Sequence, residues 1–322
     1  MSNIRNSSLL KMLLLAGWCL IFFRCETTAK SMIRAVYISR DQTDFRVVLL
    51  CPSPVPSSDS AEAEIQIESV AANADTMEKA ITQAEELLPQ DANYRLCDYL
   101  LADQTVQDEL LCMYENLVLR QQCGRTAARV VLLEESMRDL MMENDPETAW
   151  QDKLLEKLQQ ITMQMPCLYQ WQECCLYPMI YFAEGRLEVE EEGYLHTNGK
   201  YLKLSADQSK AMRLMQGGGE KFIFWLENGV VQIRRAVCSV TLTSDLVICQ
   251  LDCQTEYGMQ MPTAEQQREL EQLCARTVCE LWQQGIDLLR LQAYSRMQRG
   301  TNAEIHPTKN VCPQIRTDVR FF

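Results

Sequence analysis

The residues of this chain that could take part in catalysis or metal binding include its two histidines, His196 and His306, and its 15 cysteines. A Ser-His-Asp or Cys-His centre needs a histidine as its base, so any such centre would have to include one of these two residues. His306 lies in a polar stretch directly before Pro307. We assign both histidines to surface or packing roles, and we expect that the protein is not an enzyme.

The cysteines do not follow the spacing of a metal site. Their number is odd, no pair stands as Cys-X-X-Cys, and Cys174 and Cys175 are adjacent. A closed zinc site needs ligands at characteristic spacing, so we predict no bound metal. The favoured interpretation is that the thiols are small buried apolar groups, and one or more disulfides remain an alternative.

Two further stretches could suggest an ion or a nucleotide. Glu188, Glu190, Glu191 and Glu192 lack the Asp/Asn spacing and the glycine of a calcium loop, so a solvated strand edge is favoured. Residues 217–219 are three glycines that follow an expected helix and precede an expected strand. A phosphate-binding loop needs the opposite order, because its glycines lead into a helix N-terminus. We therefore predict a turn at the glycines and no cofactor.

Composition indicates a globular protein. The 322 residues are enough for two or three domains, and 47% of them are hydrophobic and 23% charged. The formal net charge is -13, and the chain has no cluster of Lys and Arg. Because phosphate binding by nucleic-acid-binding proteins needs concentrated positive charge, nucleic acid is disfavoured as a partner.

The sharpest change in composition is at the N-terminus. Residues 12–23 are uninterrupted apolar residues with basic residues on both sides, which is the plan of a signal peptide core. The run is short for a membrane-spanning helix, which needs about 20 apolar residues, so export is favoured over a retained anchor. We interpret residues 1–25 as a signal peptide or membrane anchor, with Cys25 as the candidate for lipidation and Cys19 as an alternative.

Residues 26–144 show alternating strand and helix patterns. Short β-branched runs are followed by an amphipathic helix with Asp75 as its expected N-cap, and strands and helices then alternate. Such an order predicts an N-terminal mixed α/β domain. Asp145 and the proline after it open a further helix, and we expect residues 145–178 to form a helical middle module or linker.

Residues 179–322 show a different sequence pattern. Short strand-like runs joined by turn residues predict an antiparallel sheet. A long helix from Thr263 to Arg299 then carries one apolar stripe. Thr263 and Gln266 form a capping box at its start, and Gly285 is where the helix should bend or break. The predicted fold class is α+β, with mixed α/β N-terminal domains and a C-terminal antiparallel sheet packed by long helices.

Several segments resemble one known family, and they do so in the same order. NADTMEKAITQAEELLPQDANYRLCDYLL is similar to the family's helix leading to a strand, and ARVVLLEESMRDLM to the strand and helix that follow. YFAEGRLEVEEEGYL with KLSADQSKAMRLMQG is similar to its strand pair, acidic patch and short helix. The long helix adds WQQGID, then Tyr294 and Arg296. Over most of its length after the N-terminal segment, the chain resembles the spore germination C-subunit lipoproteins, the Ger(x)C family.

That resemblance implies a lipoprotein of three α/β-type domains on the extracytoplasmic face of the spore inner membrane. Its partners would be the integral-membrane A and B subunits of a germinant receptor, and its role would be receptor assembly or transmission of the nutrient signal during spore germination. The family's usual Leu-X-Gly-Cys followed by Trp and Asp is not intact here, because Arg24 precedes Cys25. The alternative hypothesis is an extracytoplasmic protein that binds a small ligand between its two α/β parts.

Overall fold

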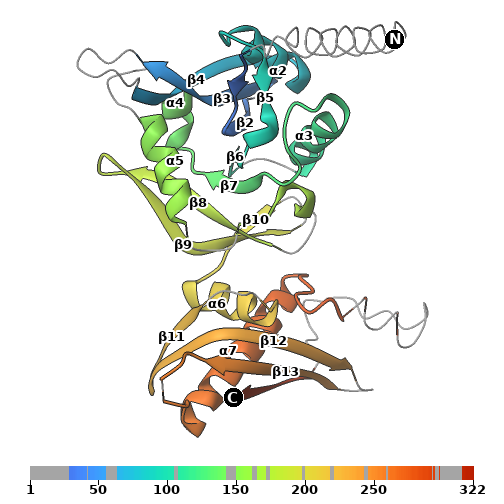
Figure 1. Ribbon diagram of the computed structural model, residues 1–322. Helices are drawn as coiled ribbons and strands as arrows, with labels where there is room; N and C mark the ends of the chain where they lie inside the picture. Colours follow the sequence, from blue (N-terminus) through green and yellow to red (C-terminus); the bar gives the residue numbers. More distant parts are fainter. Residues whose placement is uncertain are drawn as a thin grey trace, which may run out of the picture.

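The computed structural model describes residues 29–322, apart from residues 42, 56–63, 105–107, 143–149, 162–164, 172–174, 198–199, 218–220, 243–245, 259, 292, 294–296 and 298–313. Within the described ranges the chain forms sheets of two, eight and four strands, with helices packed on their faces (Figure 1). The fold class is α+β, as the sequence predicts. The expected signal peptide or anchor, with Cys19 and Cys25, lies outside the described residues.

The first and larger part of the molecule is built on the eight-stranded sheet. Its strands are β2 (Ala35–Asp41), β3 (Asp44–Val55), β4 (Glu64–Ala74), β6 (Tyr99–Asp103), β7 (Arg129–Leu133), β8 (Leu176–Ala183), β9 (Arg186–Thr197) and β10 (Lys200–Lys203). They lie in the order β10-β9-β8-β7-β6-β2-β3-β4. The four strands β8, β7, β6 and β2 are parallel, and antiparallel strands extend the sheet on both sides.

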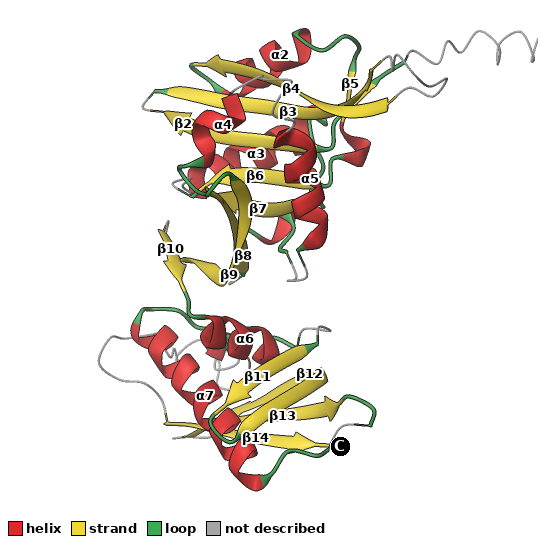
Figure 2. Cartoon of the chain, turned by 90° about the vertical axis from the view of Figure 1, so that its left-hand side faces the viewer, coloured by secondary structure: helices red, strands yellow, loops and turns green. Residues whose placement is uncertain are grey.

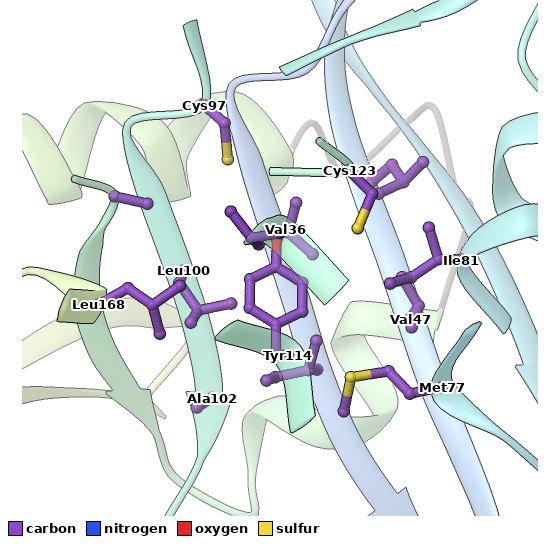
Figure 3. Packing of buried hydrophobic residues seen from close by; sticks show 14 of the residues in the cluster. Val36, Val47, Met77, Ile81, Cys97, Leu100, Ala102, Tyr114, Cys123 and Leu168 are labelled. Carbon is purple, nitrogen blue, oxygen red and sulfur yellow. The ribbon is translucent and has the colours of Figure 1, made fainter. Parts of the chain in front are cut away.

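Helices cover both faces of this sheet, because side chains from both faces of its central strands are apolar. On one face, Val36 and Ile38 of β2 share a core with α2 (Met77–Glu86) and α3 (Asp108–Gln121). On the other face, the alternate residue Tyr37 shares a core with α4 (Met137–Met142) and α5 (Trp150–Gln160). Figure 3 shows the first core, in which the ring of Tyr114 from α3 lies among the strand side chains.

The second part of the molecule is a four-stranded sheet with two helices on one face (Figure 2). Its strands, in spatial order, are β11 (Phe222–Leu226), β12 (Gly229–Leu242), β13 (Leu246–Thr255) and β14 (Gln314–Phe321). The first three are antiparallel, whereas β14 runs parallel to β13. Apolar side chains between this sheet and the helices α6 (Ala206–Met215) and α7 (Ala264–Gln283) form a separate core.

Helix α7 begins and ends where its sequence predicts. The Thr263 side-chain oxygen accepts from the Gln266 backbone N–H at 3.2 Å, and the Gln266 side chain accepts from the Thr263 N–H at 2.9 Å. The helix stops before Gly285, whose φ of 88° is easy only for glycine, so the predicted break is confirmed. Residues 284–290 are not helical, and of the expected continuation beyond them to Arg299 only residues 291, 293 and 297 are described. None of the described helices is long and apolar enough to cross a membrane.

The structure places several segments differently from the sequence-based expectation. Strands β8, β9 and β10, expected in the C-terminal antiparallel sheet, belong to the eight-stranded sheet. Helix α5, expected in a helical middle module or linker over residues 145–178, packs on a face of that same sheet. Side-chain alternation identifies a strand but carries no information on its partner, which long-range packing selects. The domain boundaries at residues 25, 144 and 178 stay a prediction.

Two smaller details also differ. The N-cap of α2 is Thr76, whose side chain accepts from the Lys79 N–H at 3.3 Å, whereas Asp75 forms an ion pair with the Lys79 side chain at 2.9 Å. Strand β14 was not predicted, and it adds a parallel strand to the C-terminal sheet, which was expected to be antiparallel.

Candidate functional site

A polar cleft of about 930 Å³ lies where a short two-stranded sheet meets the C-terminal end of α3. The short sheet pairs β1 (Ser31–Met32) with β5 (Ala92–Asn93) in parallel. The lining includes three positive and three neutral polar residues: Lys30, Arg95, Arg125, Asn93, Gln122 and Thr126. None of the described lining residues is an Asp or Glu. The cleft is therefore positively charged in a chain whose net charge is -13.

Backbone pairing brings the first basic residues to the cleft. The Ser31 N–H donates to the Asp91 carbonyl at 3.0 Å, which holds the adjacent Lys30 beside β5. Arg95 follows directly, within a 3₁₀ helix, η1 (Tyr94–Leu96). The Asn93 side-chain oxygen caps this turn by accepting from the Arg95 N–H at 3.0 Å. Because only the oxygen is used there, the amide nitrogen of Asn93 keeps its donors for another partner.

The opposite wall is shaped by the sharp end of α3. Gln122 has a φ of 56° and donates its N–H to the Val118 carbonyl at 3.1 Å, so the chain turns away from the helix axis. Gly124 then passes close to the helix. A Cβ at Gly124 would lie 2.6 Å from Val118 Cγ2 and 2.7 Å from Tyr114 Oη, so a side chain at this position would collide with the core.

The third basic residue, Arg125, belongs to a small ion-pair network. Arg34 donates to Asp98 at 3.1 Å, and Arg125 donates to the other oxygen of the same carboxylate at 3.3 Å. One carboxylate therefore serves two guanidinium groups, which leaves one positive charge uncompensated. Arg125 is 47% and Asp98 38% exposed, and exposed pairs contribute only about 0–1 kcal/mol, so this contact does not prevent Arg125 from binding another anion.

The buried cysteines among the described residues are suited to packing rather than to nucleophilic chemistry. There are six of them: Cys51, Cys97, Cys123, Cys249, Cys253 and Cys274. Burial raises the pKa of Cys97 to about 12 and the pKa of Cys123 to about 11, so these thiols are protonated at neutral pH. Only a thiolate is a good nucleophile or metal ligand, and both thiols lie in the hydrophobic core near Tyr114 (Figure 3).

The structure does not bring the other candidate residues from the sequence together in one site. His196 lies in β9 opposite Tyr201, and His306 and Cys174 lie outside the described residues. Of the acidic run, Glu188 lies 3.7 Å from Lys157, and Glu190 forms an ion pair with Lys203. Across the described part of the chain, no group of three or more His, Cys, Asp or Glu side chains is placed to hold a metal ion.

Sequence reasoning missed the cleft. Lys30, Arg95 and Arg125 are far apart in the chain, and each by itself resembles any surface charge. The cleft also lies within the first part of the molecule, whereas the alternative hypothesis expected a ligand site between the two parts. No local pattern signals this site, because its three charges meet only through the pairing of β1 with β5 and the turn after α3.

Comparison with known proteins gives a likeness of fold. No protein-family model matches the sequence, and no curated protein matches it either. Among solved structures, the chain is similar to the "Crystal Structure of the GerBC protein", with 12% sequence identity and a TM-score of 0.49. The match covers 92% of this chain and 99% of that chain.

Proposed function

We propose that this chain is a non-enzymatic, membrane-associated subunit of a spore germinant receptor, acting in receptor assembly or in transmission of the nutrient signal during germination. The observation that carries the proposal is the order of the segments that resemble the Ger(x)C family. These segments coincide with α2 and β6, with β7 and α4, with the β8–β9 hairpin, and with α6. A chance likeness of single segments would not be expected to keep their order along the chain.

In this proposal, residues 1–25 hold the protein at the extracytoplasmic face of the spore inner membrane. Cys25 is the candidate for lipidation, and the integral-membrane A and B subunits of the receptor are the partners. Substitution of Cys25 by Ala would release the protein from the membrane fraction if a lipid on this residue is the anchor. Retention of the Cys25→Ala variant would instead favour the apolar segment 12–23 as the anchor.

A subunit that works by assembly needs exposed surface of its own. The face of the four-stranded sheet opposite α6 and α7 carries Trp225, which is 74% exposed and lies opposite Val230 on the neighbouring strand. Trp is enriched in protein interfaces, because its large ring contributes much contact area. This face supports the proposal as a surface on which the integral-membrane subunits could be bound.

The test is fractionation of spores, followed by mild crosslinking and purification of this chain from the inner membrane. Co-purification of the integral-membrane A and B subunits is the expected result. Trp225→Ala should reduce their recovery, and Tyr257→Ala is the matched control, because Tyr257 is an aromatic residue that is 99% exposed in a turn. A chain that is absent from spores, or that purifies from the membrane without the A and B subunits, would refute the proposal.

A further inference from the structure

The cleft concentrates positive charge without an equal number of acids. Lys30 and Arg95 form no ion pair with any described residue, and Arg125 shares its carboxylate partner with Arg34. Charges of one sign that are held close together repel one another, so such a grouping lowers stability unless an anion lies among them. The chain has 44 Asp and Glu residues that could neutralise these positive charges, yet none of them lines the described cleft.

The groups that oppose an anion are weaker than those that favour it. The C-terminal end of α3, near Val118 and Gln122, contributes about half a negative charge, which disfavours an anion. Of the carboxylates near the cleft, Asp98 accepts from two arginines, whereas Glu85 accepts from the neutral Tyr94 hydroxyl at 2.8 Å and so keeps its negative charge. The positive charges of Lys30, Arg95 and Arg125 exceed the half charge of the helix end and the charge of Glu85 together, so the local potential favours a bound anion.

We propose that this cleft binds a small phosphate-bearing molecule, with Lys30, Arg95 and Arg125 as its phosphate ligands. A guanidinium group presents parallel N–H donors that match two phosphate oxygens, and a Lys side chain adds a point charge. Asn93, Gln122 and Thr126 supply neutral donors and acceptors suited to hydroxyl groups on the rest of the ligand. A volume of about 930 Å³ lies within the range of small-molecule sites, so the phosphate can carry a polar group such as glycerol or a sugar.

The phosphate group could come from a soluble molecule or from a lipid headgroup. Lys30 is five residues from Cys25, and five residues span at most about 18 Å. If the chain is anchored at its N-terminus, the cleft lies within reach of phospholipid headgroups. Only this lipid source depends on the membrane association proposed above. Binding of a soluble phosphate depends on the cleft alone.

Isothermal titration of the full-length chain in non-ionic detergent, with inorganic phosphate and glycerol 3-phosphate at constant ionic strength, tests the proposal. Wild-type protein should bind at least one of them saturably, and Arg95→Gln and Lys30→Gln should each weaken that binding at least tenfold. Arg120→Gln is the matched control, because Arg120 is an exposed arginine in the last turn of α3 that does not line the cleft. This variant removes the same charge and should leave the affinity within about twofold.

Competition identifies the source of the phosphate. Vesicles of phosphatidylglycerol that displace bound glycerol 3-phosphate from wild type, where phosphatidylcholine vesicles do not, would assign the site to an anionic lipid headgroup. Binding that both vesicles leave unchanged would assign it to a soluble ligand. The proposal is overturned if neither phosphate binds, or if Arg120→Gln weakens binding as much as Arg95→Gln. None of these results depends on recovery of receptor subunits, so this inference and the proposed function can fail separately.

Discussion

At the scale of single residues, Gly124 is the position where a missing side chain shapes the cleft. Gly124→Ala should lower the free energy of unfolding by about 1–3 kcal/mol, because the new methyl group would collide with Val118 and Tyr114, both buried. Urea unfolding of the purified variant would measure the loss. If the collision is the cause, Val118→Ala in the same chain should relieve part of it, so the effects of the two substitutions should not add. Simple additivity would contradict this explanation.

A second prediction concerns the buried carboxylate of Asp103, whose side chain is 1% exposed. Arg138 donates to it from Nε at 2.9 Å and from Nη2 at 2.7 Å, and this hydrogen bonding raises the pKa of Arg138. Arg138→Gln should destabilise the protein by about 3 kcal/mol or more, because it removes the guanidinium charge that is paired with a buried carboxylate.

The control for Arg138→Gln is Lys79→Gln, which breaks the exposed ion pair between Lys79 and Asp75. Equilibrium unfolding should show almost no change for this control, since exposed pairs contribute little. Equal effects of the two substitutions would mean that burial of Asp103 does not set the cost of losing its partner.

At the scale of elements, α7 depends on its first turn for a defined start. Thr263→Ala should cost about 1 kcal/mol, because the Gln266 N–H loses the side-chain oxygen that it donates to. Thr263→Ser keeps that oxygen and should remain close to wild type. Thermal or urea unfolding would compare the three proteins, and an equal loss for Ser and Ala would show that the methyl group, rather than the cap, matters.

Helix α7 also links distant parts of the second sheet. It begins at Thr263 beside the β11–β12 turn, where Gln266 donates to the Asn228 carbonyl at 3.1 Å, and Glu269 accepts from the Glu227 N–H at 2.6 Å. Farther along the helix, Glu271 accepts from the Val319 N–H of β14 at 3.0 Å. Through these contacts between side chains and backbone, the helix joins the turn after one edge strand, β11, to the other edge strand, β14.

At the scale of the whole molecule, the two parts share apolar contacts although their main cores are separate. Leu176, Leu195 and Leu204 come from the end of the eight-stranded sheet and the segment after it, yet they pack in the core between α6, α7 and the four-stranded sheet. A further contact holds the connection in place, because the Gly193 N–H donates to the Ser209 hydroxyl of α6 at 3.0 Å. The second part is thus packed on the first through β9 and α6.

Buried thiols make the stability of this molecule sensitive to alkaline pH. Burial raises the pKa of Cys249 and of Cys253 from 9.0 to about 12, so the folded state keeps protons that the unfolded state loses. Their contribution to stability is complete below about pH 8.5 and is lost as the pH rises toward 12. The free energy of unfolding should fall by up to about 1.4 kcal/mol per pH unit for each such thiol.

Urea unfolding at pH 8, 9 and 10 under reducing conditions would measure this dependence. Replacement of Cys249 and Cys253 together by Ala should reduce the loss of unfolding free energy per pH unit by the contribution of these two thiols. Cys279→Ala is the control, because Cys279 is only partly buried, and its slope should equal that of wild type. An unchanged slope in the double variant would show that other groups cause the alkaline loss.

The elements of this fold could be predicted from the sequence wherever a local signal was strong. The capping box at Thr263, the break at Gly285 and the mixture of strands and helices depend on residues within a few positions of one another. The choice between two neighbouring N-cap residues was harder to predict, because Thr76 rather than the expected Asp75 caps α2. Both residues can accept a hydrogen bond from the first turn, and the backbone at the start of the helix decides between them.

Only the tertiary structure decided which strands pair and which distant residues meet at the cleft. Strands β8, β9 and β10 show the same alternation in either sheet, and β14 could be placed only by its contact with β13. The cleft depends in the same way on three charges that long-range packing brings together. The alternation of side chains indicates which face of a strand is apolar. The strand with which it pairs depends on the whole core that both strands complete.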